Sequence, residues 1–429
     1  MTAGSSRTPF SQTESVSPRA FARIMEHLGP WLPDTPDVPP VALAVSGGGD
    51  SLALALLAAG WRKNLVALVV DHGLRPEFRQ EAALAAQILG QLGIPVHQLR
   101  VASLPYGPRL AERARKARYA VLNEACRRLG AVDLLVAHQA DDQVETVAMR
   151  EIRRAGPGLA GMAATVELAD VRLVRPLLGY SRETLRQTLR QAGLRWCDDP
   201  SNENEAAERV RVRKKLQIAE KERLWRLALD AAQQRSEQER RIAEELSESG
   251  CRLFCGAALL GEKLPSPTTL AALIRCIGAL DYLPSMEAVG ELCRNGSSAT
   301  LAGVSLSRAK VGADRNEQWL LVREAAAMEE NIPASLETVW DRRFRMQGVK
   351  TLPDGLFIGA AGNGIDRKLR AGLPTVFTKT LPAFWRNGQR VSVPHLGICE
   401  DKTLEGVGFA FVPPNPVTTT ARWMNIYLT

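Results

Sequence analysis

Residues 41–51 read VALAVSGGGDS and constrain the fold more than any other stretch of the chain. A short apolar, β-branched run breaks into three glycines and continues as the helix-like SLALALLAAG. A strand, a glycine turn and a helix N-terminus in this order form a cradle for phosphate, because glycines permit positive φ and let several backbone N–H groups approach one anion. We therefore expect nucleotide phosphates to bind at Ser46, Gly47, Gly48, Gly49, Asp50 and Ser51.

Asp50 stands inside this loop, where a carboxylate repels polyphosphate unless a divalent cation lies between them. We expect Asp50 to contact Mg²⁺. The loop lacks the lysine of a Walker A motif, which argues against a P-loop of the GTPase or kinase type. The alternative is a glycine turn before an ordinary helix, with Asp50 as its cap.

The segment that follows alternates apolar runs with helical spacing. The runs VALAV, LVALVVD, PVHQLRV and VDLLVAH alternate with helices expected at 51–59, 79–92, 109–129 and 142–153. This pattern predicts an α/β domain with a parallel sheet, whose ligands bind beyond the carboxyl ends of the strands. Three polar motifs follow such strands, SGGGDS, DHGLR at 71–75 and HQADDQVET at 138–146, so we expect them to meet in one crevice.

The motif HQADDQVET places acidic residues at the start of a helix. Asp142 and Glu145 are three apart and share a face, while Asp141 is placed to cap the helix. Opposite a phosphate loop, these carboxylates could hold magnesium or accept a proton from an attacking amine. The alternative is a capping box on a solvated helix.

Basic residues concentrate in two stretches of a chain with net charge +8, which favours a polyanionic partner. In AERARKARY, Arg115 and Arg118 project to one side and could neutralise charge that develops on an α-phosphate. The second stretch runs from Arg209 to Arg226. The alternative for both is the charged face of a solvated helix.

At this point the chain closely resembles the tRNA(Ile)-lysidine synthetases of the PP-loop ATP pyrophosphatase superfamily. The matching segments run in family order over residues 41 to about 215: SGGGDS, DHGLR, ARKARY, AHQADDQVET, GPGLAGM, RPLL and the tryptophan-to-PSN turn at 196–202. The resemblance implies a parallel-sheet PP-loop domain. Beyond it, helical spacing with glycine breaks to about Glu324 predicts a helical middle region, and short runs such as RVSVP between glycines and prolines from Pro333 onward predict a small β-rich C-terminal domain. The expected domains are a tail and leading helix at 1–38, the catalytic domain at 39–220, a helical linker or tRNA-binding region at 221–330 and an α+β domain at 331–429.

The resemblance also implies a two-step reaction. ATP adenylates the C2 carbonyl oxygen of the wobble cytidine in a CAU anticodon of tRNA(Ile), and lysine then displaces AMP to give lysidine. ATP and Mg²⁺ would be the cofactors, with Asp50 and Asp142 at the metal and Arg115 or Arg118 at the adenylate. Asp142 and Glu145 would face the lysine, and Arg209, Arg211, Arg213, Lys214 and Lys215 would contact tRNA phosphates.

Two segments depart from the family pattern. A second histidine usually follows the first, and here Gln139 takes its place, so that any catalytic role at this point rests on His138. Ala207 and Val210 stand where the family has an aromatic residue and an asparagine, although Arg209 and Arg213 match.

Other functions fit the residues of the chain less well. An amidotransferase needs a nucleophilic cysteine in a glutaminase, and the first cysteine, Cys126, lies inside the nucleotide-binding region. A tRNA thiolase needs C-x-x-C pairs, and the seven cysteines form none. An RNA-binding scaffold without turnover is the alternative of a different class. No apolar run reaches the length of a membrane span and no signal peptide opens the chain, so we expect a cytosolic protein, with its oligomeric state left open.

Overall fold

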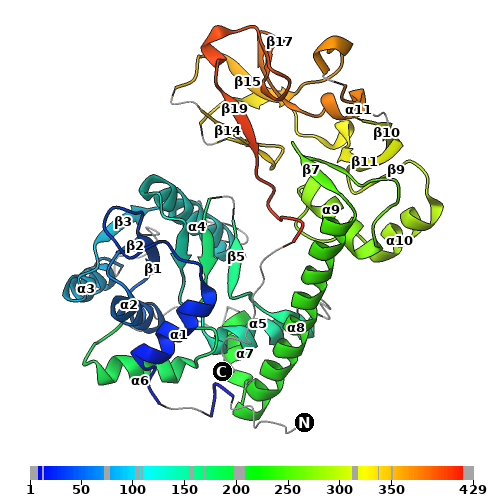
Figure 1. The fold of residues 1–429 in the computed structure, drawn as a ribbon. Coiled ribbons are helices and arrows are strands. Elements are labelled where there is room, and N and C mark those ends of the chain that lie inside the picture. Colours follow the sequence, from blue (N-terminus) through cyan, green and yellow to red (C-terminus); the bar gives the residue numbers. More distant parts are fainter. Residues whose placement is uncertain are drawn as a thin grey trace. The chain divides into compact units, whose positions relative to one another are not determined.

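The computed structural model describes residues 8–11, 14–71, 78–101, 107, 110–153, 159–168, 170–197, 208–311, 317–336, 338–348, 351–370 and 372–418. Most of the DHGLR motif, the start of GPGLAGM and the PSN turn with Ala207 lie outside these residues. The chain forms two compact units, one within residues 1–238 and one within residues 239–419. The long helix α8 (Ile218–Glu248) carries the chain from the first unit into the second (Figure 1).

The first unit is built on a six-stranded sheet in the order β3-β2-β1-β4-β6-β5. Every neighbouring pair is parallel except β5 and β6, which confirms the expected α/β fold and adds one antiparallel edge strand. The strands are β1 (Val41–Val45), β2 (Leu65–Asp71), β3 (Val96–Arg100), β4 (Asp133–Leu135), β5 (Thr165–Glu167) and β6 (Arg172–Val174).

Helices cover both faces of this sheet, because β1 is apolar at every position and buries alternate side chains on opposite sides. Val41, Leu43 and Val45 pack with one group of helices, whereas Ala42 and Ala44 pack in the core that includes α4. The helices are α1 (Pro18–Leu28), α2 (Gly49–Trp61), α3 (Phe78–Gln91), α4 (Leu110–Leu129), α5 (Ala140–Ile152), α6 (Arg182–Gln191) and α7 (Glu208–Lys215).

The second unit combines helices with antiparallel sheets. Helices α9 (Pro267–Ile277) and α10 (Met286–Asn295) pack on a sheet of order β7-β8-β11-β10-β9, formed by Arg252–Phe254, Ala257–Leu259, Glu317–Arg323, Val304–Lys310 and Ala299–Leu301. The helices of the middle region are thus accompanied by a sheet that we did not predict. Three of its strands have only three residues, too few for an alternation of apolar and polar residues to stand out.

The expected β-rich C-terminal part contains two further antiparallel sheets. One has the order β12-β15-β16-β17-β18, formed by Ile332–Pro333, Leu356–Ala360, Pro382–Arg386, Gln389–Val393 and Ile398–Cys399. The other joins β13 (Val339–Trp340), β14 (Phe344–Gln347) and β19 (Gly408–Phe411), and a short helix α11 (Thr375–Thr378) follows β15. Within the described residues, no helix combines the length and apolar character needed to cross a bilayer.

Candidate active site

The glycine loop joins β1 to α2 at the carboxyl edge of the parallel sheet. Gly47 has φ +86°, whereas Gly48 is the extended N-cap of α2 and Gly49 is its first residue, so only one of the three glycines uses positive φ. The hydroxyl of Ser51 donates to the Gly48 carbonyl at 2.8 Å and accepts from the backbone N–H of Ser46 at 3.2 Å. These bonds hold the loop open around the N-terminus of α2, where backbone N–H groups favour an anion.

Gly49 has helical φ, and its lack of a side chain allows a different feature, the close approach of Trp196. A Cβ at this position would lie 3.2 Å from the Trp196 ring, and the neighbouring Gly48 forms a parallel bridge with Cys197. The tryptophan-to-PSN turn therefore begins against the phosphate loop, although the two motifs are separated by about 150 residues of sequence.

The acidic turn begins α5, and Gln139 rather than Asp141 caps that helix. The Gln139 side-chain oxygen accepts from the backbone N–H groups of Asp141 and Asp142, and the Gln139 N–H donates to the Asp142 carboxylate at 3.2 Å. The capping box considered from the sequence is thus present, with Gln139 as its first member.

Asp141 instead binds two other helices. It accepts from the backbone N–H of Arg182, at the start of α6, at 2.9 Å and from the Lys221 ammonium of α8 at 2.5 Å. Burial alone would raise the pKa of Asp141, but these donors lower it below its ordinary value. Asp141 is therefore a structural anion that connects α5, α6 and α8, and the prediction that it caps its own helix is wrong.

Glu145 is the most buried carboxylate of the site, with 1% of its side chain exposed. Arg209 Nε lies 2.7 Å from one Glu145 oxygen and Arg213 Nε lies 2.6 Å from the other. Arg209 also reaches Asp142 at 3.2 Å. Two of the three arginines predicted to bind tRNA therefore face the acidic residues in this structure, one turn apart on α7.

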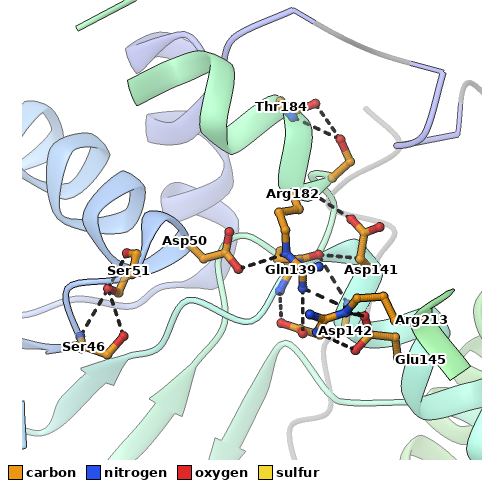
Figure 2. A network of polar contacts seen from close by, with 12 residues as sticks. Ser46, Asp50, Ser51, Gln139, Asp141, Asp142, Glu145, Arg182, Thr184 and Arg213 are labelled. Carbon is orange, nitrogen blue, oxygen red and sulfur yellow. Dashed lines mark hydrogen bonds and ion pairs between the residues drawn. The ribbon is translucent and has the colours of Figure 1, made fainter. Parts of the chain in front are cut away.

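Arg182 joins the phosphate loop to the acidic residues, and sequence reasoning missed it. Its guanidinium nitrogens lie 3.7 Å from Asp50, 3.7 Å from Asp142 and 3.9 Å from Glu145, and Figure 2 shows it between the phosphate loop and α5. The signal in the sequence was its place at the start of the helix after β6, at the same sheet edge as the other motifs.

The carboxylate of Asp50 is weakly acidic in this setting. Burial raises its pKa to about 6, and the negative charges of Asp142 and Asp141 add to this rise. Arg182 and the Gln139 side chain act in the opposite direction. The pKa of Asp142 is also raised, again chiefly by burial. Two carboxylates with raised pKa thus face each other across one arginine.

His138 precedes the acidic turn and lies among arginines. Burial, followed by the positive charges of Arg175, Arg115, Arg118 and Arg209, lowers the pKa of His138 well below its ordinary value. The imidazole is therefore neutral at neutral pH. Both Arg115 and Arg118 lie on α4 with their guanidinium groups over the Tyr119 ring, at 5.0 and 5.9 Å from its centre. The structure thus brings these two predicted residues close to His138.

The remaining predicted tRNA contacts lie on a different side of α7. Arg211, Lys214 and Lys215 are exposed, whereas Val210 is buried. Because the short helix α7 presents Arg209 and Arg213 to the acidic residues and these three cations to solvent, the basic stretch divides into two groups with different surroundings.

The carboxylates of the site could hold magnesium only if a bound substrate supplied further oxygen ligands. Among the described residues, no group of three or more His, Cys, Asp or Glu side chains is placed to hold a metal ion by itself. Mg²⁺ is commonly held by one or two carboxylates, with waters and phosphate oxygens completing the shell. Asp50 and Asp142 fit such a role, since both have a raised pKa and the charge of Asp142 contributes to the rise at Asp50.

Comparison with known proteins identifies the family of the chain. Residues 20–220 match the family model described as a PP-loop domain. A tRNA(Ile)-lysidine synthase from Ruegeria pomeroyi is 33% identical over 391 residues, covering 85% of this chain and 90% of the relative. One from Mesorhizobium japonicum is 35% identical over 350 residues, covering 76% of each chain.

A third relative, from a Bradyrhizobium species, is 45% identical over 180 residues, which cover 40% of this chain and half of the relative. Identity is therefore highest in a part of the chain, and the two longer alignments extend it over most of the length. The phosphate loop, the acidic residues at the start of α5 and the similarity over most of the chain lead to one conclusion: the chain belongs to the tRNA(Ile)-lysidine synthase family of PP-loop ligases.

Proposed function

We propose that this chain performs its family's reaction, the ATP-dependent ligation of lysine to the wobble cytidine of tRNA(Ile), in the crevice between the phosphate loop and α5. The observation that carries the proposal is the convergence of Asp50, Asp142 and Glu145 on Arg182. A nucleotide phosphate and an amine nucleophile must meet within one site for this chemistry, and here a phosphate cradle adjoins buried carboxylates.

In the first step, the loop of residues 46–51 binds the pyrophosphate part of ATP, while the C2 oxygen of cytidine attacks the α-phosphorus and pyrophosphate leaves. The N-terminus of α2 and the Ser46 hydroxyl supply donors to the phosphate oxygens, while the Ser51 hydroxyl, which donates to the Gly48 carbonyl, holds the loop in place. Asp50 and Asp142 would hold Mg²⁺, which would neutralise phosphate charge. Arg115 and Arg118 would face the adenylate, beside a neutral His138.

In the second step, the lysine amine attacks C2 of the cytidine, AMP leaves, and the proton of the amine passes to a carboxylate. Asp142 suits this transfer because its pKa is raised and 15% of its side chain is exposed. Glu145 suits it less, since Arg209 and Arg213 occupy both of its oxygens. We assign Glu145 the positioning of these two arginines.

The test uses purified protein, ATP, Mg²⁺, lysine and an unmodified tRNA(Ile) transcript with a CAU anticodon. Wild-type protein should exchange pyrophosphate into ATP when tRNA is present and should form lysidine and AMP when lysine is added. Asp142→Asn should lower lysidine formation by about 100-fold or more, because it removes the proton acceptor of the second step. Pyrophosphate exchange should fall by less, since Asp50 would still hold Mg²⁺ in the first step.

Asp230→Asn provides the matched control, since it makes the same chemical change at an exposed position of α8. It should leave both rates unchanged. Tight tRNA binding without exchange in the wild type would favour a scaffold that has lost turnover. Wild-type lysine transfer by Asp142→Asn would refute the role given to Asp142.

A further inference from the structure

Gln139 is completely buried in the site, at the start of α5 and near the phosphate loop of residues 46–51. Its Oε1 accepts from the backbone N–H groups of Asp141 and Asp142, and its own N–H donates to the Asp142 carboxylate. One end of this side chain therefore fixes the backbone turn that carries both aspartates, and with it the direction of the Asp142 carboxylate.

The other end of the Gln139 side chain is directed at the phosphate loop. Its Nε2 is buried and has no hydrogen-bond partner among the described residues. The Gln139 side chain nevertheless lowers the pKa of Asp50, as expected of an amide donor that faces a carboxylate. Burying an unpaired N–H destabilises a folded protein. An unpaired buried donor at this position therefore indicates a function when substrates are bound.

Building on the function proposed above, we propose that Gln139 is a positioning residue of the active site: Oε1 fixes Asp142 at the start of α5, while Nε2 orients Asp50 beside the bound nucleotide. One uncharged side chain then sets the separation of the two carboxylates that meet the nucleotide and the amine. The charged groups that already face Asp50 are Arg182 of α6 and Asp141 and Asp142 of α5.

The chemistry of an amide explains why it suits this place. A carboxylate here would add a third negative charge beside Asp50 and Asp142, and an imidazole would cap α5 only while its acceptor nitrogen carries no proton. A glutamine presents an acceptor to the turn and a donor to Asp50 at every pH at which the protein is folded.

Two substitutions separate positioning from simple capping. Gln139→Asn keeps a preferred N-cap residue but is one methylene shorter, so its amide nitrogen withdraws from Asp50. Gln139→Glu keeps the length and the acceptor but replaces the donor by a negative oxygen. Ser17→Ala is the control, since it removes the N-cap of α1, whose Oγ accepts from the Ala20 N–H at 3.2 Å away from this crevice.

Three quantities are measured for each variant: the rate of tRNA-dependent pyrophosphate exchange, the Kd of a non-hydrolysable ATP analogue with Mg²⁺, and the midpoint of thermal unfolding. We expect Gln139→Asn to unfold near the wild-type temperature while its exchange rate falls about 10- to 100-fold. The Kd of the analogue should rise in Gln139→Asn, and further in Gln139→Glu, since the site loses a donor and then gains a negative charge beside the phosphates.

Wild-type rates and analogue affinities in both variants would overturn the proposal and leave Gln139 as a helix cap only. The same holds if every loss of activity follows a lower unfolding temperature and is restored by cooling. Failure of the proposed function is recognised separately, because wild-type protein would then give no exchange and no lysidine. The Kd of the ATP analogue in the two variants would still test Gln139.

Discussion

Asp50 shows at the level of one residue how catalytic demand opposes stability. Its carboxylate lies among two other aspartates and is 26% exposed, and burial together with these charges raises its pKa to about 6. Because the folded protein binds this proton more tightly than the unfolded chain, with its ordinary value of 3.8, ionising Asp50 destabilises the fold.

Asp50→Asn should therefore stabilise the protein while it abolishes pyrophosphate exchange. The destabilisation by the ionised carboxylate is absent below pH 3.8, grows as the pH rises to about 6 and is complete above that. At pH 8 the variant should gain up to about 2 to 3 kcal/mol in free energy of unfolding, at roughly 1.4 kcal/mol per pKa unit.

Chemical denaturation at pH 8 and pH 5 measures this gain, with Asp230→Asn as the exposed control. The gain should shrink at pH 5. A variant that is less stable than wild type at pH 8, or a gain that does not depend on pH, would contradict this account of Asp50.

At the level of elements, α7 brings together cations with two kinds of neighbour. Arg209 and Arg213 pair with Glu145, whereas Arg211 and Lys215, four residues apart, are exposed. If the exposed group binds RNA phosphates, its effect is electrostatic and independent of base sequence.

Arg211→Ala/Lys215→Ala should weaken tRNA binding, and the slope of log K against log salt should fall in magnitude by about 1.4 to 1.8, since each phosphate contact contributes roughly 0.7 to 0.9. Filter binding between 50 and 300 mM salt would measure it. The control Arg19→Ala/Arg23→Ala removes two exposed arginines from α1 and should leave the slope unchanged. Equal slopes in all three proteins would remove α7 from the tRNA interface.

At the level of the whole molecule, two units have separate hydrophobic cores. The parallel sheet is packed by side chains such as Phe21, Leu54 and Leu135, whereas Leu273, Trp319 and Val289 belong to a core of the second unit. Separate cores can unfold in separate transitions, each responding only to ligands that bind its own unit.

Calorimetry should accordingly resolve two transitions, of which an ATP analogue raises only one. At a ligand concentration 100 times its Kd, the nucleotide-binding unit should gain about 2.7 kcal/mol, with no change in the other transition. Gly47→Ala serves as the control because its strained φ of +86° should weaken binding and remove this shift. A single transition that moves as a whole would show that the units unfold together.

The sequence alone determined the nucleotide-binding half of this protein to a large extent. Strong β-branched runs, glycines at the strand ends and helical spacing are local signals, and the parallel sheet with its phosphate loop is confirmed. The motifs also identified the family, because their order along the chain can be read without knowing how the chain packs.

Tertiary structure decided which charges meet. Arg182 lies more than 130 residues from Asp50, Asp141 binds α6 and α8 instead of its own helix, and Arg209 with Arg213 pairs with Glu145. The secondary-structure propensity of a segment does not predict such partners. A salt bridge depends on the distance between side chains after folding and on the exclusion of water around them. The sequence thus named the chemical groups, and packing set their pairing and pKa values.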